Sequence, residues 1–182
     1  MAQLEVYFDG SVEGNPGPGW IGVLVLLDGQ AVEEITEPIG RTTSNAAEYR
    51  ALIRAVEAAL KLAPDAVTFY SDSQLVVNQV QGRFACRSPH LQRLLARAQE
   101  LLDQLPSWEL VQVPRERNLA HPLAQGPRDR PWKRFYVTLT PEEVARIKAL
   151  ARARGLKPDE LVREWIREAL DSADSVGAGG GR

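Results

Sequence analysis

Residues 4–27, LEVYFDGSVEGNPGPGWIGVLVLL, decide the fold of the first part of this chain. Two apolar runs, Leu4 to Phe8 and Trp20 to Leu27, flank a segment rich in glycine, proline and asparagine, which favour tight turns. We therefore expect two strands joined by a turn. The dipeptide Asp28-Gly29 then predicts a hairpin that leads into a third strand at Gln30 to Pro38. The chain is thus predicted to begin with an antiparallel meander.

Helices and further strands are predicted beyond the meander. Ser44 is expected to cap a helix that runs to about Lys61, because alanine, valine and leucine recur there at helical spacing. The elements after it are a strand at Asp65 to Ser71, a short helix at Gln74 to Val80, a helix at His90 to Leu105 capped by Ser88, and a strand at Trp108 to Val113. This order predicts an α/β fold, a mixed sheet with helices packed on it.

The chain then changes character. Arg115 to Pro131 is rich in proline, arginine and glycine and has no periodicity, so it is interpreted as a linker. We divide the chain into a domain at residues 1–126, a linker at 127–132, a second module at 133–171 and a disordered tail at 172–182.

The second module shows the pattern of one strand and two helices. Polar and apolar residues alternate from Arg134 to Leu139, as in a strand with one buried face. Thr140 to Glu143 forms a capping box, and Gly155 is expected to end the helix that follows. Lys157 then opens a second helix with a wide apolar stripe.

Charge is divided unevenly along the chain. The net charge is −2, but residues 1–126 carry ten Lys/Arg against fifteen Asp/Glu, and residues 127–182 carry twelve against nine. Residues 128–157 alone hold nine basic and three acidic residues. A basic stretch favours an anionic partner, although a solvated helix face explains such a pattern equally simply.

Cysteine content and hydropathy indicate the compartment. Cys86 is the only cysteine, which excludes an intrachain disulfide and a cysteine-rich zinc site. No apolar run approaches the roughly 20 residues that span a bilayer, and the N-terminus lacks the features of a signal peptide. We expect a soluble, cytoplasmic protein with no membrane partner.

Three carboxylates occupy positions where a buried charge needs a partner. Asp9 follows the apolar run at 4–8, Glu48 lies in the helix after Ser44, and Asp72 follows the strand at 65–71. A buried carboxylate without a partner costs several kcal/mol, so we expect a divalent metal ion beside them. Each acid alone has an ordinary interpretation as surface charge or a helix cap.

Four segments in order resemble the type 1 ribonuclease H family: DGSVEGNPGPG, SNAAEYRAL, YSDSQLVVNQ and VPRERNLAHPLA, at residues 9–19, 44–52, 70–79 and 113–124. The resemblance covers roughly residues 2 to 125. It implies a ribonuclease H-like mixed five-stranded sheet with flanking helices, dependence on Mg²⁺ or Mn²⁺, and endonucleolytic cleavage of the RNA strand of an RNA–DNA hybrid.

The resemblance implies that Asp9, Glu48 and Asp72 are metal ligands. Phosphodiester hydrolysis at neutral pH needs an activated water and stabilisation of the leaving oxygen, and two metal ions about 3.5–4 Å apart supply both. Carboxylate oxygens are the ligands that Mg²⁺ prefers. Asp9 would bridge the ions.

The fourth catalytic position departs from the family pattern. The family usually presents an aspartate after Asn-x-x-Ala, whereas this chain is one residue shorter there and has His121. His121 is interpreted as a weaker fourth catalytic ligand or as a group that helps product and metal leave. A loop histidine without a role is the other interpretation, and Pro122 disfavours a helix through this position.

The resemblance also implies contacts with the RNA strand. These are the backbone at Gly14 and Asn15, the side chain of Asn45, and Gln79 on the helix after Asp72. Recognition of 2′-hydroxyl groups is what separates RNA from DNA. Gly14 also fits an ordinary turn residue, and Gln79 also fits a plain helix surface.

The module at 133–171 resembles the ribbon-helix-helix family. That fold is an intertwined homodimer, because one strand and two short helices bury too little apolar surface alone. Arg134, Tyr136 and Thr138 would then enter the major groove of double-stranded DNA, with Lys157 at a helix start that faces a phosphate. The alternative is a module that only dimerises.

These observations favour a metal-dependent hybrid ribonuclease whose C-terminal module pairs two catalytic domains and holds them on nucleic acid. A rival hypothesis is a DNA-binding regulator whose ribonuclease-like domain is impaired at His121. A third is the same metal chemistry acting on DNA or on double-stranded RNA.

Overall fold

A computed structural model of the chain describes residues 4–126 and 139–177, with side chains described as far as 170. The chain divides into two compact units, Met1–Val137 and Thr138–Arg182, called here the first and second units. The predicted linker at 127–132 and the predicted strand residues 134–138 lie outside the described residues.

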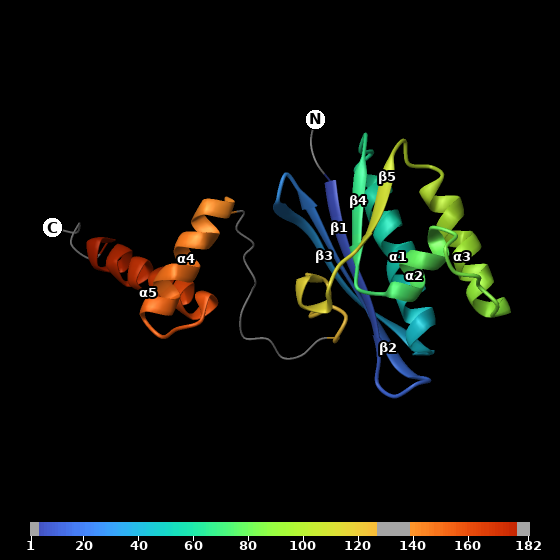
Figure 1. Cartoon of the computed structure of the whole chain (residues 1–182), viewed down its shortest axis with the longest axis horizontal. Coiled ribbons are helices and arrows are strands. Elements are labelled where there is room, and N and C mark those ends of the chain that lie inside the picture. The colour runs from blue at the N-terminus through green and yellow to red at the C-terminus, as the bar shows by residue number, and fades with distance from the viewer. Residues whose placement is uncertain (1–3, 127–138, 178–182) are drawn as a thin grey trace. The chain divides into compact units, whose positions relative to one another are not determined.

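The first unit is built on one mixed sheet of five strands (Figure 1). Its strands are β1 Leu4–Val12, β2 Gly17–Leu27, β3 Gln30–Thr42, β4 Val67–Ser71 and β5 Trp108–Gln112. They lie in the order β3-β2-β1-β4-β5. The meander β1-β2-β3 is antiparallel, and β4 and β5 add to β1 in parallel. The predicted five-stranded mixed sheet is confirmed.

Three helices cover one face of this sheet (Figure 1): α1 Ser44–Lys61, α2 Gln74–Val80 and α3 Pro89–Leu102. They enclose the main core against inward side chains such as Val6, Phe8 and Val23, all fully buried. The cap of α1 is Thr43 and not the predicted Ser44, since the Thr43 hydroxyl accepts from the Ala46 N–H. Small buried residues on α1, such as Ala47 and Ala51, let its backbone approach the sheet closely.

The opposite face of the sheet is covered near the site by residues 115–126, called here the 115–126 segment. Leu123 packs there against Leu24 and Leu26 in a second, smaller cluster. The prediction of a linker is therefore wrong for this segment. Its turns have no periodicity for sequence reasoning to detect, yet Asn118, Ala120 and Ala124 are buried.

Strand ends differ most from the sequence prediction. β2 begins at Gly17 and β3 continues to Thr42, because Gly17, Pro18 and Gly19 pair with residues 40–42 at the far end of the hairpin. Glycine and proline here extend the ladder and do not end it. Helix α3 stops at Leu102 and not at Leu105.

The second unit contains α4 Pro141–Ala153 and α5 Pro158–Gly177. The predicted capping box is confirmed, with Thr140 and Glu143 bonded to each other's backbone N–H. Gly155 follows α4 with φ +69°, as its predicted role requires. Helix α5 includes residues 172–177 of the predicted disordered tail, because no helix breaker precedes Gly177.

Within its described side chains, the second unit buries little apolar surface. Ala151 and Leu161 are buried between α4 and α5. Leu150, Ile166 and Leu170 remain 38%, 52% and 60% exposed. No helix in the described part of the chain has the length and apolar character that a membrane span requires.

Candidate active site

Asp9 lies in the middle of the sheet, in the second half of β1. Its side chain is only 3% exposed. In the antiparallel ladder Asp9 is paired with Gly22 of β2. A side chain at residue 22 would come within 2.4 Å of the Ala124 nitrogen, so glycine is required for the 115–126 segment to lie against the sheet at this point.

Glu48 comes from the second turn of α1, which presses against β1 beside Asp9. A side chain at Gly10 would lie 2.3 Å from the backbone carbon of Ala47, so only glycine permits this approach. The Gly10 N–H then donates to Oε2 of Glu48 at 3.2 Å. In β1, Asp9 is therefore one of the acids, and Gly10 leaves the space in which α1 brings Glu48 close to it.

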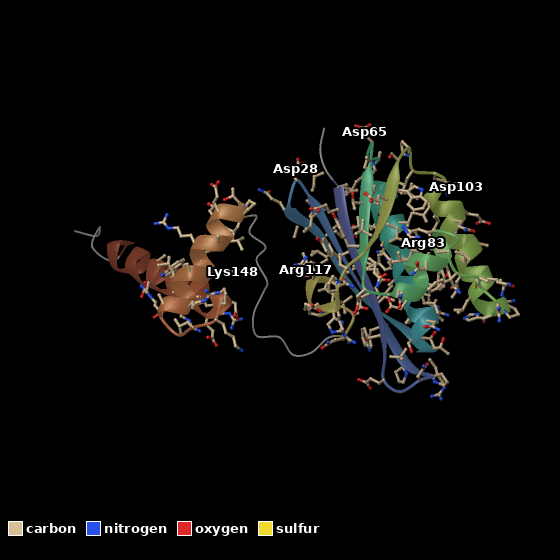
Figure 2. All side chains as sticks on the ribbon, viewed as in Figure 1. Asp28, Asp65, Arg83, Asp103, Arg117 and Lys148 are labelled. Carbon is tan, nitrogen blue, oxygen red and sulfur yellow. The ribbon has the colours of Figure 1, made fainter. Side chains whose placement is uncertain are left out.

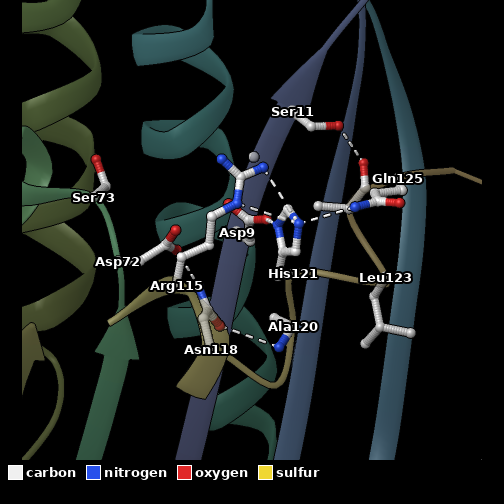
Figure 3. A network of polar contacts seen from close by, with 12 residues as sticks. Asp9, Ser11, Asp72, Ser73, Arg115, Asn118, Ala120, His121, Leu123 and Gln125 are labelled. Carbon is white, nitrogen blue, oxygen red and sulfur yellow. Dashed lines mark hydrogen bonds and ion pairs between the residues drawn. The ribbon is translucent and has the colours of Figure 1, made fainter. Parts of the chain in front are cut away.

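Asp72 is the first residue after β4, which runs parallel to β1. Because parallel strands end at the same edge of a sheet, Asp72 comes close to Asp9. Its Oδ1 accepts from Nδ2 of Asn118 at 2.5 Å (Figure 3). The three acids predicted from sequence thus come from a strand, a helix and a strand end that meet at one place.

The pKa values of Asp9 and Glu48 are shifted by burial and by the charges of the neighbouring acids. The pKa of Asp9 is raised to about 6, chiefly by burial, with the Asp72 charge adding and the hydrogen bond from His121 opposing. Burial, and then the charges of Asp9 and Asp72, raise the pKa of Glu48 well above its usual value. The site therefore concentrates negative charge in a place shielded from water.

His121 lies directly against Asp9. Its Nδ1 is 2.7 Å from Oδ2 of Asp9, and its side chain is 20% exposed (Figure 3). Its Nε2 faces Nε and Nη2 of Arg115, each at 3.3 Å, and Nε2 of Gln125 at 2.9 Å. His121 therefore contacts an acid of the site, and the interpretation of it as a loop histidine without a role stays a prediction.

Three residues of this network were not predicted as site residues. Asn118 is 3% exposed and donates from Nδ2 to the Phe8 carbonyl at 2.9 Å as well as to Asp72, while its Oδ1 accepts from the Ala120 N–H. Arg115 and Gln125 hold His121. The signal for Asn118 was present in the Asn-x-x-Ala setting. Nothing in the sequence marks Arg115 or Gln125.

The 115–126 segment is itself bonded to the meander. The Ser11 hydroxyl donates to the Ala124 carbonyl, and the Thr36 hydroxyl donates to the Leu123 carbonyl at 3.1 Å. Together with Asn118 and the Phe8 carbonyl, these bonds join the segment to β1 and β3. His121 thus lies in a turn that is hydrogen-bonded to two strands of the sheet.

The acids suit a hard divalent cation, although no group of three or more His, Cys, Asp or Glu among the described residues is already arranged around a metal position. Three carboxylates supply the oxygen ligands that Mg²⁺ and Mn²⁺ favour. Burial and mutual repulsion raise the pKa values of Asp9 and Glu48, and a cation would relieve both costs. The residues therefore fit a metal.

The residues predicted to contact RNA lie in three places. Gly14 and Asn15 are exposed in the β1–β2 turn, with Gly14 at φ +77°. The Asn15 Oδ1 accepts from the Ser44 N–H at 3.2 Å, which joins this turn to the start of α1, where Asn45 is exposed. Gly14, Asn15 and Asn45 therefore lie on neighbouring, solvent-facing backbone.

Gln79 is not on the helix surface. It is 7% exposed, its Oε1 accepts from the Tyr49 hydroxyl at 2.8 Å, and its Nε2 donates to the Ala85 carbonyl at 3.2 Å. The interpretation of Gln79 as ordinary surface is wrong. The protein contacts fix its amide orientation and connect α2 to α1.

In the second unit, the backbone N–H of Lys157 donates to Oε2 of Glu160 at 2.9 Å. A carboxylate therefore already occupies one donor of the helix start that was predicted to face a phosphate. Arg134, Tyr136 and Thr138 lie outside the described residues.

Comparisons with known proteins identify the family of the first unit. A family model described as reverse transcriptase-like matches residues 7–126. The crystal structure of RNase H1 from Halobacterium salinarum is 42% identical, with a TM-score of 0.66 over 68% of this chain and 95% of that one. The chain belongs to the type 1 ribonuclease H family. This family is generally dependent on divalent metals.

Other members of the ribonuclease H family show the same relationship. The N-terminal RNase H domain of a Mycobacterium tuberculosis protein is 37% identical, with a TM-score of 0.66 over 69% of this chain and 92% of that domain. An RNase H1 isolated from compost, solved in complex with RNA/DNA hybrid, is 36% identical with a TM-score of 0.62, over 67% of this chain and 94% of that one.

The full-length relatives are longer than the part of them that matches this chain. Ribonuclease HI of Halobacterium salinarum is 45% identical over 117 residues, which are 64% of this chain and 59% of that protein. A bifunctional protein of Mycobacterium tuberculosis is 39% identical over 112 residues, which are 60% of this chain and 31% of that protein. The family model ends at residue 126 and leaves the second unit out.

Proposed function

We propose that the first unit is a metal-dependent endoribonuclease that hydrolyses the RNA strand of RNA–DNA hybrids. The observation that carries the proposal is the meeting of Asp9, Glu48 and Asp72 beside the central strand β1, where the pKa values of Asp9 and Glu48 are raised by burial and by neighbouring acids. The ribonuclease H relatives, one of them solved with a bound RNA/DNA hybrid, support the choice of substrate.

In this proposal Asp9, Glu48 and Asp72 hold two Mg²⁺ or Mn²⁺ ions. Bound ions supply an activated water and neutralise charge that develops on the leaving 3′ oxygen. The chain's own contribution is to fix the acids. Gly10 holds Glu48 through its N–H, and Asn118 holds Asp72. Arg115 adds positive charge at an exposed position where a phosphate would approach.

We assign hybrid recognition to the exposed backbone at Gly14 and Asn15, to Asn45 and to Gln79. The Asn15 to Ser44 hydrogen bond supports this assignment, because it makes the two exposed segments one surface. Gln79 would contribute either directly or by fixing Tyr49 and residue 85.

For the second unit we propose dimerisation, with DNA tethering through Arg134, Tyr136 and Thr138 as an added role. The exposure of Leu150, Ile166 and Leu170 supports an apolar contact with a second copy of the chain. The bond between Lys157 and Glu160 weighs against phosphate binding at the start of α5. Dimerisation is therefore the better supported of the two roles.

The deciding experiment is cleavage of a labelled RNA–DNA hybrid by the full chain with Mg²⁺ or Mn²⁺. Asp9→Asn should lower the rate by more than the roughly 10–100-fold that is typical for the loss of an outer-shell residue. Asp65→Asn is the matched control, since Asp65 is an exposed acid just before β4 (Figure 2). Absence of metal-dependent and Asp9-dependent cleavage would refute the proposal.

The rival proposals are separated by the same assay. A regulator impaired at His121 would bind hybrid without cutting it. A nuclease for another substrate would cut double-stranded DNA or double-stranded RNA faster than the hybrid. Asp9, Glu48 and Asp72 together favour the active enzyme, because a site without metal gains nothing from burying clustered acids.

A further inference from the structure

The two nitrogens of His121 face opposite kinds of group. On one side, Nδ1 lies 2.7 Å from a carboxylate oxygen of Asp9. On the other side, Nε2 faces two N–H groups of Arg115. A guanidinium has five donors and no acceptor, so Nε2 must be the ring nitrogen that accepts. The proton of the neutral ring is then on Nδ1, which donates to Asp9.

Gln125 supports this tautomer. Its amide nitrogen is 2.9 Å from Nε2 of His121, so it can donate to the same lone pair. The ring is thus held by two side chains from its own turn, at positions 115 and 125. The ring orientation follows from these contacts without any ligand.

This arrangement does not suit a metal ligand. An imidazole coordinates through a lone pair, and here the lone pair on Nε2 points at a cationic guanidinium. The other nitrogen is occupied by Asp9. A divalent cation at Nε2 would have to displace Arg115 and accept its repulsion.

The hydrogen bond from His121 engages Oδ2 of Asp9 and not Oδ1. It therefore fixes the carboxylate rotation and leaves Oδ1 as the oxygen available to a cation. In metal sites such outer partners orient the ligands and tune their affinity. Asn118 does the same for Asp72, through Oδ1.

We propose that His121 is a positioning residue, held by Arg115 and Gln125, that orients Asp9 through Nδ1, in the place where the family usually has a fourth carboxylate. The inference rests on the proposed metal-dependent function and assigns His121 a role within it. It is an alternative to the interpretation of His121 as a fourth ligand; the other interpretation from the sequence, a group that helps product and metal leave, stays a prediction.

The tautomer is tested directly on the full chain. Long-range ¹H–¹⁵N spectra distinguish a protonated Nδ1 from a protonated Nε2, and the chain has only two histidines, so His90→Ala assigns the signals. His90 is exposed on α3, away from the network, and serves as the matched control. We expect the Nδ1–H form for His121. The Nε2–H form would overturn the proposal.

Coordination is tested with Mn²⁺ as the probe. Electron spin echo spectra of bound Mn²⁺ detect a directly bonded imidazole nitrogen, and we expect none in the wild-type chain. A nitrogen coupling that persists in His90→Ala and disappears in His121→Ala would identify His121 as a ligand and overturn the proposal. Neither spectrum depends on the enzyme being active.

Kinetics complete the test. His121→Ala should lower kcat and Mn²⁺ affinity by about 10–100-fold with little change in KM for the hybrid, because His121 orients a ligand and does not touch the substrate. His121→Asn, whose amide N–H can take the place of Nδ1–H, should retain most of both. Equal losses in the two variants, or none in either, would contradict the proposal.

These experiments distinguish failure of the proposed ribonuclease function from failure of the proposed role of His121. If the wild-type chain binds Mn²⁺ but cleaves no hybrid, the ribonuclease proposal fails while the two spectra still decide the role of His121. If the wild-type chain cleaves and His121→Ala cleaves equally well, only the positioning role fails. Unfolding of His121→Ala would leave the wild-type spectra as the deciding measurements.

Discussion

Gly22 lies directly opposite Asp9 in the β1–β2 ladder, and the space beside its missing side chain is filled by backbone of Ala120, Leu123 and Ala124. The glycine thus sets how closely the turn that carries His121 can approach the acid. We expect Gly22→Ala to push this turn outward and to lower both stability, by about 1–3 kcal/mol, and cleavage. Thermal unfolding and kcat measure the two effects.

The control for this substitution is Gly40→Ala. Gly40 has φ +70° and nothing within 4 Å of an added side chain, so alanine there strains the backbone without touching the site. Both variants should be less stable than the wild type, but only Gly22→Ala should lose activity. Equal activity in the two variants would show that the approach of the turn is unimportant.

Asn118 should be required for full activity, although it binds no metal in this proposal. Asn118→Ala removes the donor to Asp72 and leaves the buried Phe8 carbonyl and Ala120 N–H without their partner. The expected loss is about 1–3 kcal/mol of stability and about 10–100-fold in kcat. Chemical denaturation and hybrid cleavage check these values.

The substitution Asn118→Asp keeps the shape of the side chain but replaces the donor to Asp72 with a negative charge. Its Oδ1 can still accept from Ala120, but a carboxylate replaces the donor beside Asp72, so activity should fall at least as far as in Asn118→Ala. An Asn118→Asp variant as active as the wild type would mean that the contact with Asp72 does not orient that acid.

The metal-free protein should lose stability as pH rises. The pKa of Asp9 is raised from 3.8 to about 6 by folding, so between these values the folded state binds more protons than the unfolded state. The cost of burying the charge is absent below about pH 4 and fully present above about pH 6. Glu48, whose pKa is also raised, extends the fall to higher pH.

Asp9→Asn isolates this effect, because asparagine does not titrate. In a chelator, the free energy of unfolding should fall more between pH 4 and pH 7 for the wild type than for the variant, by up to roughly 3 kcal/mol. Mg²⁺ at pH 7 should recover the difference in the wild type alone. Parallel pH curves for the two proteins would contradict the prediction.

The second unit should govern the oligomeric state. Ile166 and Leu170 are more than half exposed on α5, so aspartate at both positions should convert a dimer to a monomer in sedimentation experiments. Leu62→Asp is the control, since Leu62 is a 46% exposed apolar residue after α1 in the first unit. A wild-type chain that sediments as a monomer would remove the dimerisation proposal.

The sheet and the three acids could be predicted because each depends on local signals. The apolar run before Asp9, a helix that begins near Ser44 and a strand that ends before Asp72 are all visible as periodicity with turn residues at the ends, although β1 continues past Asp9 to Val12. The family motifs placed them in order. The structure supplied their proximity, which depends on Gly10 and on parallel pairing of β1 with β4.

The 115–126 segment could not be predicted in the same way. Its hydrogen bonds to Phe8, Ser11 and Thr36 join residues that are 87 to 113 positions apart in the sequence. Turns of this kind have no repeating pattern, so they are easily taken for a linker. The roles of Arg115 and Gln125 follow from the turn and became visible only with it.

Asn118, and not a helix, fastens the last segment of the site to β1, and His121 then lies against Asp9 at the position where the family usually has its fourth acid. A search for ribonucleases H that demands four acids would pass over this protein. In this chain such a search could use instead the glycine opposite the first acid, Gly22, and the asparagine beside the third, Asn118.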